Sequence, residues 1–394
     1  MPTRPRLRTE VRGQPADPPG TVVLYDPCRV APQPLTLGPA AVQVVGRCDG
    51  SATVVDIAAA VGCPVGAVQT LIDALDDGLF LDGPKFHAYL NGPERRPSCI
   101  GCYPPEPEAI RQQLDGLFTA AGGPGLPGTV RDDLPPVRAV LAPHMDYARG
   151  GVTYGWAFKE LAERTRAKLF VIVATSHYSA ERFTLTRQHF RTPLGLVETD
   201  QRAVDLLARE YGDGVFADRM AHYPEHSVEL EVLMLQHVLA GRGDFRIVPL
   251  LCGSFGDRVA ASSDPDGAAD IARMAAAIRK LEAAAGEPVC YVVSGDLAHI
   301  GPKFRDPVPL DDARLAASRK QDERILRQLE AADQTMYFAA IAAESDERNI
   351  CGLPPTWLTL AVAKPARGRV LHYQQFVHPE RHESVSFAAA AFDA

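Results

Sequence analysis

Four segments of this chain share one arrangement, in which a short apolar run leads directly into a polar loop. They are LAPHMDYARGG (Leu141–Gly151), KLFVIVATSHYS (Lys168–Ser179), FRIVPLLCGSF (Phe245–Phe255) and VCYVVSGDLAHIG (Val289–Gly301). Short apolar runs rich in β-branched residues and separated by helical stretches are typical of buried parallel strands. In open α/β sheets ligands bind outside the carboxyl ends of the strands. The pattern therefore predicts a fold class and the sheet edge where a site lies.

The size and charge of the chain exclude several classes of protein. Its 394 residues are enough for two or three domains, and its net charge of −8 argues against a nucleic-acid partner held through phosphates. No stretch approaches the length of a membrane-spanning helix, and the Arg-containing N-terminus has no apolar run behind it. We therefore expect a cytoplasmic protein without a membrane partner.

The eight cysteines are scattered as in a reduced, cytosolic protein. Cys99 and Cys102 form the one CxxC pair, and no second pair at matching spacing completes a structural zinc site. The sequence predicts two incidental thiols there.

The N-terminal quarter divides into a tail and a small domain. We expect residues 1–36, rich in Pro and Arg, to be disordered, and residues 37–90 to fold separately. Within the small domain the pattern predicts helices over 39–46, 54–61 and 64–79, followed by a β-hairpin in LFLDGPKFHAYL. Helices followed by a hairpin indicate a winged helix.

This small domain has the wrong charge for reading DNA. Its segment 36–90 contains six Asp residues but only Arg47 and Lys85 as strong bases. The segment CDGSATVVDIAAAVGC…LIDALDDGLFL resembles the PqqD-like domains that accompany radical-SAM and peptide-modifying systems. The resemblance implies capture of a peptide at a strand edge, and a structural or docking appendage without a peptide ligand is an equal alternative.

Residues 95–394 read as one α/β domain with a largely parallel central sheet flanked by helices. The pattern predicts helices over 152–165, 226–240, 311–331 and 335–345, and a final strand in SVSFAAAAF.

Three histidines, His144, His177 and His299, follow predicted strands and should meet at one edge of the sheet. Histidines with a carboxylate and open positions suit a divalent metal, in first place non-haem iron, with zinc or copper as alternatives. Asp296 lies three residues before His299 and either binds the metal directly or orients an imidazole.

Three further residues are candidates for proton transfer or for holding a ligand in place. His226 should open the helix that follows it, where the helix dipole lowers an imidazole pKa, so it is the candidate general base. Glu225, beside it, and Asp146, two residues after His144, are candidate catalytic or orienting carboxylates. The competing interpretation is capping, of a turn by Asp146 or Asp296 and of a helix by Glu225 and His226.

From Arg96 onwards the chain resembles the MEMO family, whose bacterial members are called AmmeMemoRadiSam system protein B. The blocks that carry the resemblance are RPSCIGCYPPEPEAIRQQLDGLF, APHMDYARGG, VATSHYS, TPLGLVETD, EHSVELEVLMLQ, IVPLLCG, SGDLAHIG, CGLPP and SVSFAAAAF. The resemblance implies a fold similar to class III extradiol dioxygenases, which hold Fe(II) with two histidines and a carboxylate. It places two metal ligands on His144 and His177 and the base on His226.

The third ligand departs from the family pattern. Animal members resemble S-S-D-F-C-H-W-G and use the cysteine, whereas this chain has Ala298 there, so His299 or Asp296 must substitute. We choose His299. The family's P-H-A-G-Y has become PHMDY, which places Asp146 and Arg149 at the mouth of the expected pocket.

The resemblance favours a metal-dependent redox enzyme acting on an unknown small molecule or peptide, together with radical-SAM and other AmmeMemoRadiSam proteins. Two alternatives stay open: a non-catalytic metal- or peptide-binding partner, and a zinc hydrolase in which metal-bound water attacks the substrate.

Overall fold

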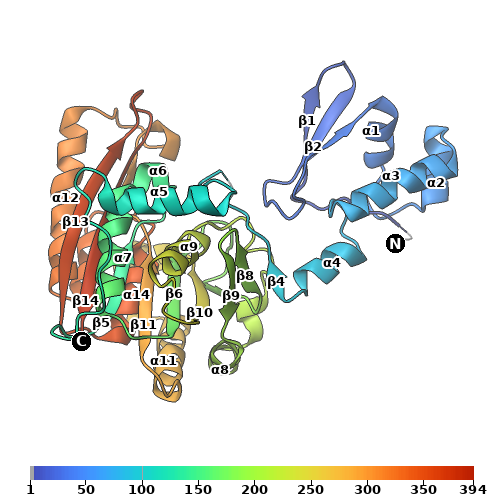
Figure 1. Ribbon diagram of the computed structural model, residues 1–394. Coiled ribbons are helices and arrows are strands. Elements are labelled where there is room, and N and C mark those ends of the chain that lie inside the picture. The colour runs from blue at the N-terminus through green and yellow to red at the C-terminus, as the bar shows by residue number, and fades with distance from the viewer. Residues whose placement is uncertain (1–3, 100) are drawn as a thin grey trace. The chain divides into compact units, whose positions relative to one another are not determined.

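The chain forms two compact units, Met1–Ser98 and Cys99–Ala394, in a computed structural model that describes residues 4–99 and 101–394 (Figure 1). Residues 1–3 of the expected tail, and Ile100 within the Cys99–Cys102 pair, lie outside the described residues. None of the helices in the described ranges has the length and apolar character that a membrane span requires.

The N-terminal unit begins with an antiparallel sheet of order β1-β2-β3, followed by four helices. The strands are β1 (Arg12–Ala16), β2 (Thr21–Tyr25) and β3 (Leu35–Leu37), and the short β4 (Glu94–Arg95) comes near the end of the unit. The helices are α1 (Pro39–Val45), α2 (Val54–Val61), α3 (Val65–Asp77) and α4 (Pro84–Leu90). The three helices predicted upstream of Leu79 are therefore present.

The expectation of a disordered tail over residues 1–36 is wrong for its described part. Leu24 and Val11 are buried in one apolar cluster with residues of α2 and α3. The buried guanidinium of Arg8 donates to Asp26 over 2.7 Å, so the charge is paired inside the unit. The Pro- and Arg-rich composition of this segment favours disorder, but its apolar stretch TVVLY supplies enough apolar surface for a small sheet. Composition alone therefore did not predict these strands.

The hairpin predicted in LFLDGPKFHAYL is also wrong. Leu81 forms an isolated antiparallel bridge with Leu7, and the chain then enters α4 at Pro84. Proline suits the first turn of a helix because its fixed φ matches and its missing N–H has no partner to lose there. The apolar alternation thus ends in a helix whose Phe86 is buried, and the wing expected after α3 is absent from these described residues.

The large unit is built around a sheet whose central strands β5, β11, β6 and β10 lie side by side and parallel. These strands are β5 (Val137–Ala142), β6 (Leu169–Thr175), β10 (Arg246–Cys252) and β11 (Val289–Ser294). They are the four apolar runs singled out in the sequence. The prediction of a largely parallel sheet flanked by helices is confirmed.

Outer strands extend this sheet on both sides, in the order β12-β14-β5 on one and β10-β9-β8 on the other. Antiparallel β13 pairs with β14, and antiparallel β7 pairs with β10. Their bounds are β7 (Phe183–Leu185), β8 (His189–Thr192), β9 (Gly195–Thr199), β12 (His299–Ile300), β13 (Arg367–Val377) and β14 (Ser384–Asp393). The predicted final strand SVSFAAAAF is β14.

Side chains of the central strands alternate between two apolar cores, as the two-residue period of a strand requires. Val171 and Val173 of β6 belong to one core, and Phe170 and Ile172 to the other. The first core includes residues of α8, α11 and α14, whereas the second includes residues of α5, α7 and α9 (Figure 1). The sheet is therefore covered on both faces, and its carboxyl edge is left for polar loops.

Of the ten helices in the described part of the large unit, the four at 152–164, 229–238, 312–330 and 334–342 agree with the predicted spans to within a few residues, and the other six had no predicted span. The ten helices are α5 (Pro107–Thr119), α6 (Tyr147–Gly150), α7 (Val152–Arg164), α8 (Gln201–Tyr211), α9 (Glu229–Val238), α10 (Gly256–Ala260), α11 (Ala269–Ala284), α12 (Asp312–Glu330), α13 (Gln334–Ala342) and α14 (Leu353–Ala363). Short 3-10 turns cover Asp213–Phe216, Pro265–Gly267 and Pro302–Phe304.

Candidate metal centre

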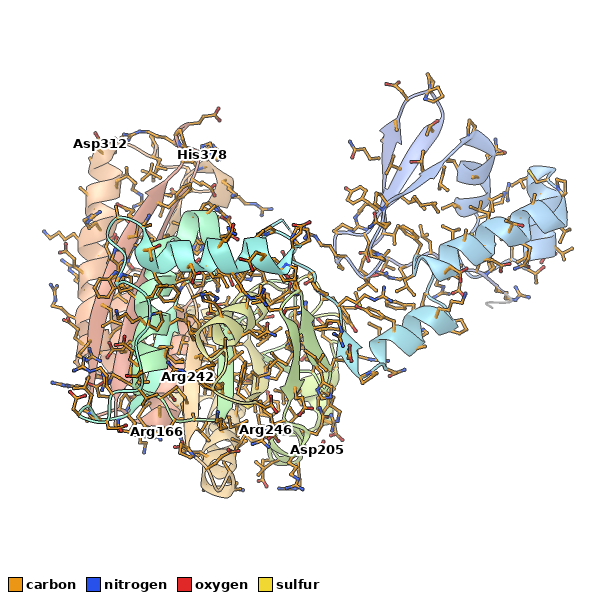
Figure 2. All side chains as sticks on the ribbon, in the orientation of Figure 1. Arg166, Asp205, Arg242, Arg246, Asp312 and His378 are labelled. Carbon is orange, nitrogen blue, oxygen red and sulfur yellow. The ribbon has the colours of Figure 1, made fainter. Side chains whose placement is uncertain are left out.

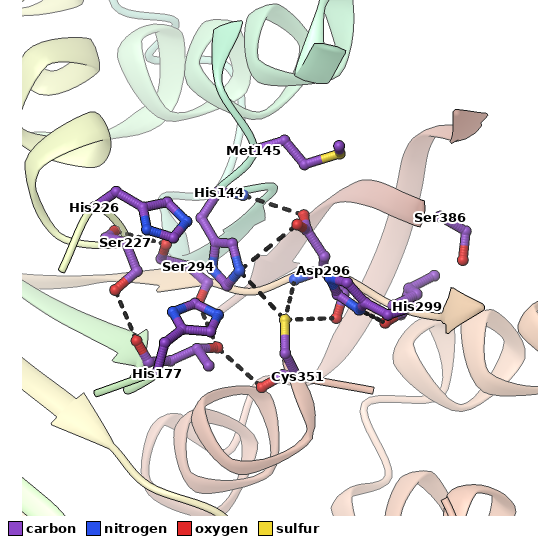
Figure 3. A network of polar contacts seen from close by, with 12 residues as sticks. His144, Met145, His177, His226, Ser227, Ser294, Asp296, His299, Cys351 and Ser386 are labelled. Atoms are coloured by element: carbon purple, nitrogen blue, oxygen red, sulfur yellow. Dashed lines mark hydrogen bonds and ion pairs between the residues drawn. The ribbon is translucent and has the colours of Figure 1, made fainter. Parts of the chain in front are cut away.

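Three imidazoles meet at the carboxyl edge of the parallel sheet (Figure 3). His144 and His177 each stand two residues beyond the end of a strand, β5 and β6, and His226 lies in the loop before α9. Their ring centroids are 4.9 Å apart for His144 and His177, 5.3 Å for His144 and His226, and 5.0 Å for His177 and His226. One nitrogen from each ring lies within 4.8 Å of the others, so the predicted edge does gather histidines.

One buried carboxylate, Glu225, holds two of these residues in place. Its oxygens lie 3.0 and 3.2 Å from Nδ1 of His177, and they also accept the backbone N–H groups of His177 and His226 over 2.7 and 3.0 Å. Burial alone would raise the pKa of Glu225, but the hydrogen bond and the charge of His177 outweigh it and lower the pKa to about 2. The charged carboxylate fixes Nδ1 of His177 as the protonated nitrogen and leaves Nε2 free to bind a cation.

We expected His226 to lie at the start of a helix, and this expectation is wrong. Helix α9 begins at Glu229, with Val228 as its N-cap. The pKa of His226 is nevertheless lowered, first by burial, with the charge of His177 adding to it against the opposing effect of Glu225. A neutral ring that can accept a proton thus results from burial rather than from a helix dipole.

His144 is the most enclosed of the three rings, with its side chain 2% exposed. Its pKa lies well below the ordinary value, because burial and then the charges of His177 and His226 disfavour the protonated ring. Its Nε2 faces the sulfur of Cys351 at 3.3 Å and Oδ2 of Asp296 at 3.6 Å. A neutral imidazole aimed at a thiol and a carboxylate is a suitable metal donor.

Asp296 stands two residues beyond the end of β11, the same offset as the two histidines on the neighbouring strands. Its Oδ1 accepts the backbone N–H of His144 over 3.1 Å. Burial raises the pKa of Asp296 to about 7, against the lowering effect of that hydrogen bond. The carboxylate therefore connects the loops after β5 and β11.

Cys351 joins the cluster from a distant part of the chain, and we assigned it no role from the sequence. With His144 and Asp296 it forms a second set of donor atoms within 4.8 Å of one another. It lies just before α14, in the block CGLPP. The local sequence shows a cysteine followed by glycine, shortly before the proline in the first turn of α14. This pattern does not predict which distant residues lie beside the cysteine.

The structure places His299 outside this cluster. Its Nδ1 lies 3.1 Å from the carbonyl oxygens of both Leu297 and Asn349, and its ring packs edge-on against Phe304. Burial lowers its pKa to about 4. None of the three-donor groups found among the described residues includes His299, and its neighbour Ala298 is buried in the apolar core.

Asp146 has the capping role that was the alternative interpretation. It is the N-cap of α6, and its carboxylate accepts the backbone N–H of Arg149 over 3.1 Å and Nε over 2.5 Å. The carboxylate beside His144 is thus Asp296.

Two cavities adjoin the cluster. One of about 330 Å³ is lined by His177, His299, Lys303, Phe304, Arg305, Asn349 and Cys351. The other, of about 230 Å³, shares His177, Asn349 and Cys351 with it and reaches Ser254 and Phe255. Both are of a size for part of a small molecule.

A third donor group lies away from this edge, in the loop between β13 and β14. His378, Glu380 and His382 offer donor atoms within 4.8 Å, but the Glu380 side chain is 82% exposed. Figure 2 shows His378 near Asp312 at the start of α12. An exposed group of this kind is common without a metal, so the buried cluster is the stronger candidate.

The fold and the cluster define an α/β protein with a candidate metal centre at the carboxyl edge of its parallel sheet. A family model described as "Memo-like protein" matches residues 95–391. The chain belongs to the Memo-like family, and the resemblance found in its sequence blocks is confirmed.

Archaeal and bacterial relatives support this assignment. A MEMO1 family protein of Methanopyrus kandleri is 28% identical over 308 residues, which cover 76% of this chain and 99% of that protein. One of Methanobrevibacter smithii is 26% identical and covers 68% of this chain and 87% of its own length. One of Aquifex aeolicus is 22% identical over 389 residues, which cover 94% of this chain and 95% of that protein.

Proposed function

We propose that this protein is a metal-dependent redox enzyme that resembles class III extradiol dioxygenases and binds one divalent ion, in first place iron. The observation that carries the proposal is the convergence of three imidazoles whose donors lie within 4.8 Å, two of them held by the single carboxylate of Glu225. Imidazole donors with open positions suit iron, zinc and copper, and iron would supply the redox chemistry with oxygen.

The residues present fit a metal ion. His144 is kept neutral by burial, and His177 has one ring nitrogen committed to Glu225 and the other free. A ligating histidine that donates its second N–H to a carboxylate is the usual arrangement at protein metal sites. We assign His144 and His177 as ligands through Nε2 and Glu225 as the residue that orients His177.

We assign His226 as the general base. Its ring stacks against that of His177, with 14° between the planes, and its side chain is 28% exposed, so it borders both the ligands and solvent. With a lowered pKa it is neutral near pH 7 and can take a proton from a substrate hydroxyl at Nδ1 or Nε2.

The substrate we propose is a small molecule that occupies the cavity of about 330 Å³ beside His177. Lys303 and Arg305 on its lining favour a substrate with a negative charge. Lys303 also forms an ion pair with Glu383, so Arg305 is the side chain of the two with the greater freedom to turn towards a ligand.

For the N-terminal unit we propose a peptide or protein ligand. Its sheet has β1 and β3 as outer strands of the described β1-β2-β3 order, and an outer strand can accept an extended peptide through backbone hydrogen bonds. The partners we propose are radical-SAM and other AmmeMemoRadiSam proteins, in the cytoplasm.

Anaerobic loading with Fe(II), followed by exposure to oxygen in the presence of candidate phenolic substrates, tests the proposal. We expect one iron per chain and oxygen consumption that His226→Ala abolishes while it keeps the iron. Iron binding without turnover for any substrate would favour a non-catalytic partner, and turnover of esters or amides with zinc alone would favour a hydrolase. Loss of iron in His226→Ala would make that residue a ligand instead of a base.

A further inference from the structure

We infer that the substrate carries a protonated amine in addition to its negative charge, and that Asp346 binds this amine in the cavity of about 230 Å³. The inference deepens the proposed function and rests on it. This cavity shares His177 and Asn349 with the cavity of about 330 Å³ that we assign to the substrate. A single small molecule beside the metal centre can therefore extend into both cavities.

Asp346 is the only carboxylate among the described residues that line the 230 Å³ cavity, and none of those residues is a lysine or an arginine. Phe255 and Leu353 add apolar surface to the same lining. Burial raises the pKa of Asp346 to about 6, against the lowering effect of a hydrogen bond from the backbone N–H of Ile350. A cation bound beside this carboxylate would offset the cost of keeping it charged.

The cations nearest to Asp346 are already paired. Arg348, two residues farther along the chain, is buried and forms ion pairs with Glu344 and Asp322. Arg182, which lies next to the lining, forms two ion pairs with other aspartates. In the described part of the chain Asp346 itself has no ion pair. Its charge is therefore available to a ligand.

The loop that carries Asp346 adopts an uncommon backbone conformation. The φ angles of Ser345, Asp346 and Asn349 are 55°, 50° and 53°. Such left-handed conformations are rare outside glycine, although Asp and Asn adopt them most readily, and they cluster at binding and active sites. Oδ1 of Asp346 accepts the N–H of Ile350 over 2.7 Å, which holds the carboxylate in place. Capping of the turn would explain that bond, so a test must separate the charge of Asp346 from its hydrogen bond.

A second polar group on the lining lacks a partner. The hydroxyl oxygen of Ser176 is buried and has no hydrogen bond to the described residues. A buried polar atom without a partner is costly, and a donor on a ligand would satisfy it. A protonated amine has three N–H donors, enough for both Asp346 and Ser176.

The opposite charge is available in the 330 Å³ cavity. The guanidinium of Arg305 lines it and makes no hydrogen bond or ion pair with the described residues. The two cavities that share His177 thus offer one unpaired cation and one unpaired carboxylate. A substrate with both an acidic and an amino group matches this pair.

Four phenols that differ in the charged groups of their side chains test the inference. They are p-ethylphenol, which is uncharged, tyramine, which carries the amine, hydroxyphenylpropionate, which carries the acid, and free tyrosine, which carries both. Calorimetric titration of Fe(II)-loaded full-length protein without oxygen measures their dissociation constants. We expect tyramine to bind about tenfold tighter than p-ethylphenol, as is typical of a hydrogen bond between charged groups, and tyrosine to bind tightest.

Two variants identify the group responsible. Asp346→Asn keeps an acceptor for the N–H of Ile350 and tolerates the left-handed backbone, but it removes the charge. It should weaken tyramine binding about tenfold and leave the binding of p-ethylphenol and hydroxyphenylpropionate unchanged. Asp333→Asn is the matched control, because Asp333 also accepts a backbone N–H, from Met336 over 2.9 Å, and lines neither cavity. It should change none of the four affinities.

The outcomes separate the inference from the proposed function. Equal affinities of the wild type for tyramine and p-ethylphenol, or no binding of tyramine, would overturn the inference and leave the metal centre intact. An unchanged affinity of folded Asp346→Asn for tyramine would overturn the role of this residue. Failure of the wild type to bind stoichiometric iron would instead overturn the proposed function. The comparison of the four phenols needs only the wild type, so it decides the matter even where Asp346→Asn is unfolded.

Discussion

The loops after β5 and β6 differ from the loop after β11 in where each places its histidine. His144 and His177 stand two residues beyond the strand end, whereas His299 stands five residues beyond Ser294. At the two-residue offset of the third loop the chain has Asp296, which does reach the cluster. Beyond Asp296 the chain turns back and forms β12, which pairs with β14 and places His299 opposite Val385. Distance from the strand end, more than residue type, therefore decides which side chains enter the site.

The largest expected effect is on Fe(II) binding, and it tests the difference between His144 and His299 directly. His144→Ala should abolish stoichiometric Fe(II) binding, because it removes the donor shared by both candidate ligand sets. His299→Ala should keep the iron, because none of the three-donor groups among the described residues includes His299. Metal analysis after anaerobic loading and gel filtration measures both variants side by side. Equal losses in the two variants would return His299 to the ligand set.

Asp296 gives the next largest effect, in the stability of the metal-free protein. Its pKa is raised by burial to about 7 from 3.8, so the folded state holds a proton that the unfolded state releases. Stability should therefore fall as pH rises from about 4 to about 7, by roughly 4 kcal/mol, and stay level above that. Asp296→Asn should lack this loss, and the difference between the two proteins in urea unfolding measures it. A difference that does not change with pH would contradict the assignment.

Glu225 should show the opposite dependence on pH. Its pKa is lowered to about 2 from 4.5 by its bonds to His177, which overcome burial, so its carboxylate stabilises the folded state above the unfolded pKa. That contribution, about 3 kcal/mol, should be lost as pH falls from about 4.5 to about 2. Glu225→Gln removes it. Urea unfolding of the two metal-free proteins at neutral and acid pH measures their free energies of unfolding. These free energies should converge in acid, and a difference that is the same at both pH values would contradict this role of Glu225.

The smallest effect concerns the glycine contact that brings the third loop to the cluster. Gly352→Ala should destabilise the protein by about 1–3 kcal/mol, because its Cβ would overlap the carbonyl oxygen of Asp296. Gly116→Ala is the matched control, since it lies inside α5 with nothing within 4 Å and should be stabilising by about 0.5–1 kcal/mol. Thermal unfolding measures the melting temperatures of the two variants. Similar changes of melting temperature in both would contradict a special role for the contact between Gly352 and Asp296.

The sequence predicted those parts of the structure that depend on local pattern. Apolar runs identified the strands β5, β6, β10 and β11, and their parallel order placed His144 and His177 at one edge. His226 and Glu225 were recognisable because they stand together in one polar block before the buried helix α9. Periodicity is a local property, so these elements needed no knowledge of distant contacts.

The features that the sequence did not reveal depend on contacts between distant segments. Cys351 lies 207 residues from His144, and only the packing of two glycine-containing loops brings them together. The sheet within residues 12–37 is stabilised by a core shared with α2 and α3, which local composition does not show. The helix at Pro84 replaced a hairpin because alternation over a few residues fits either structure, and the proline decides.

The most direct test of the central claim is the position of the ion in crystals grown from anaerobically iron-loaded protein. Anomalous scattering at the iron edge locates the metal independently of any assumed ligand. We predict one strong peak within bonding distance of Nε2 of His144 and Nε2 of His177, with Cys351 beside it and His299 away from it. A peak only at His378 and His382, or no peak at the carboxyl edge of the sheet, would contradict the account.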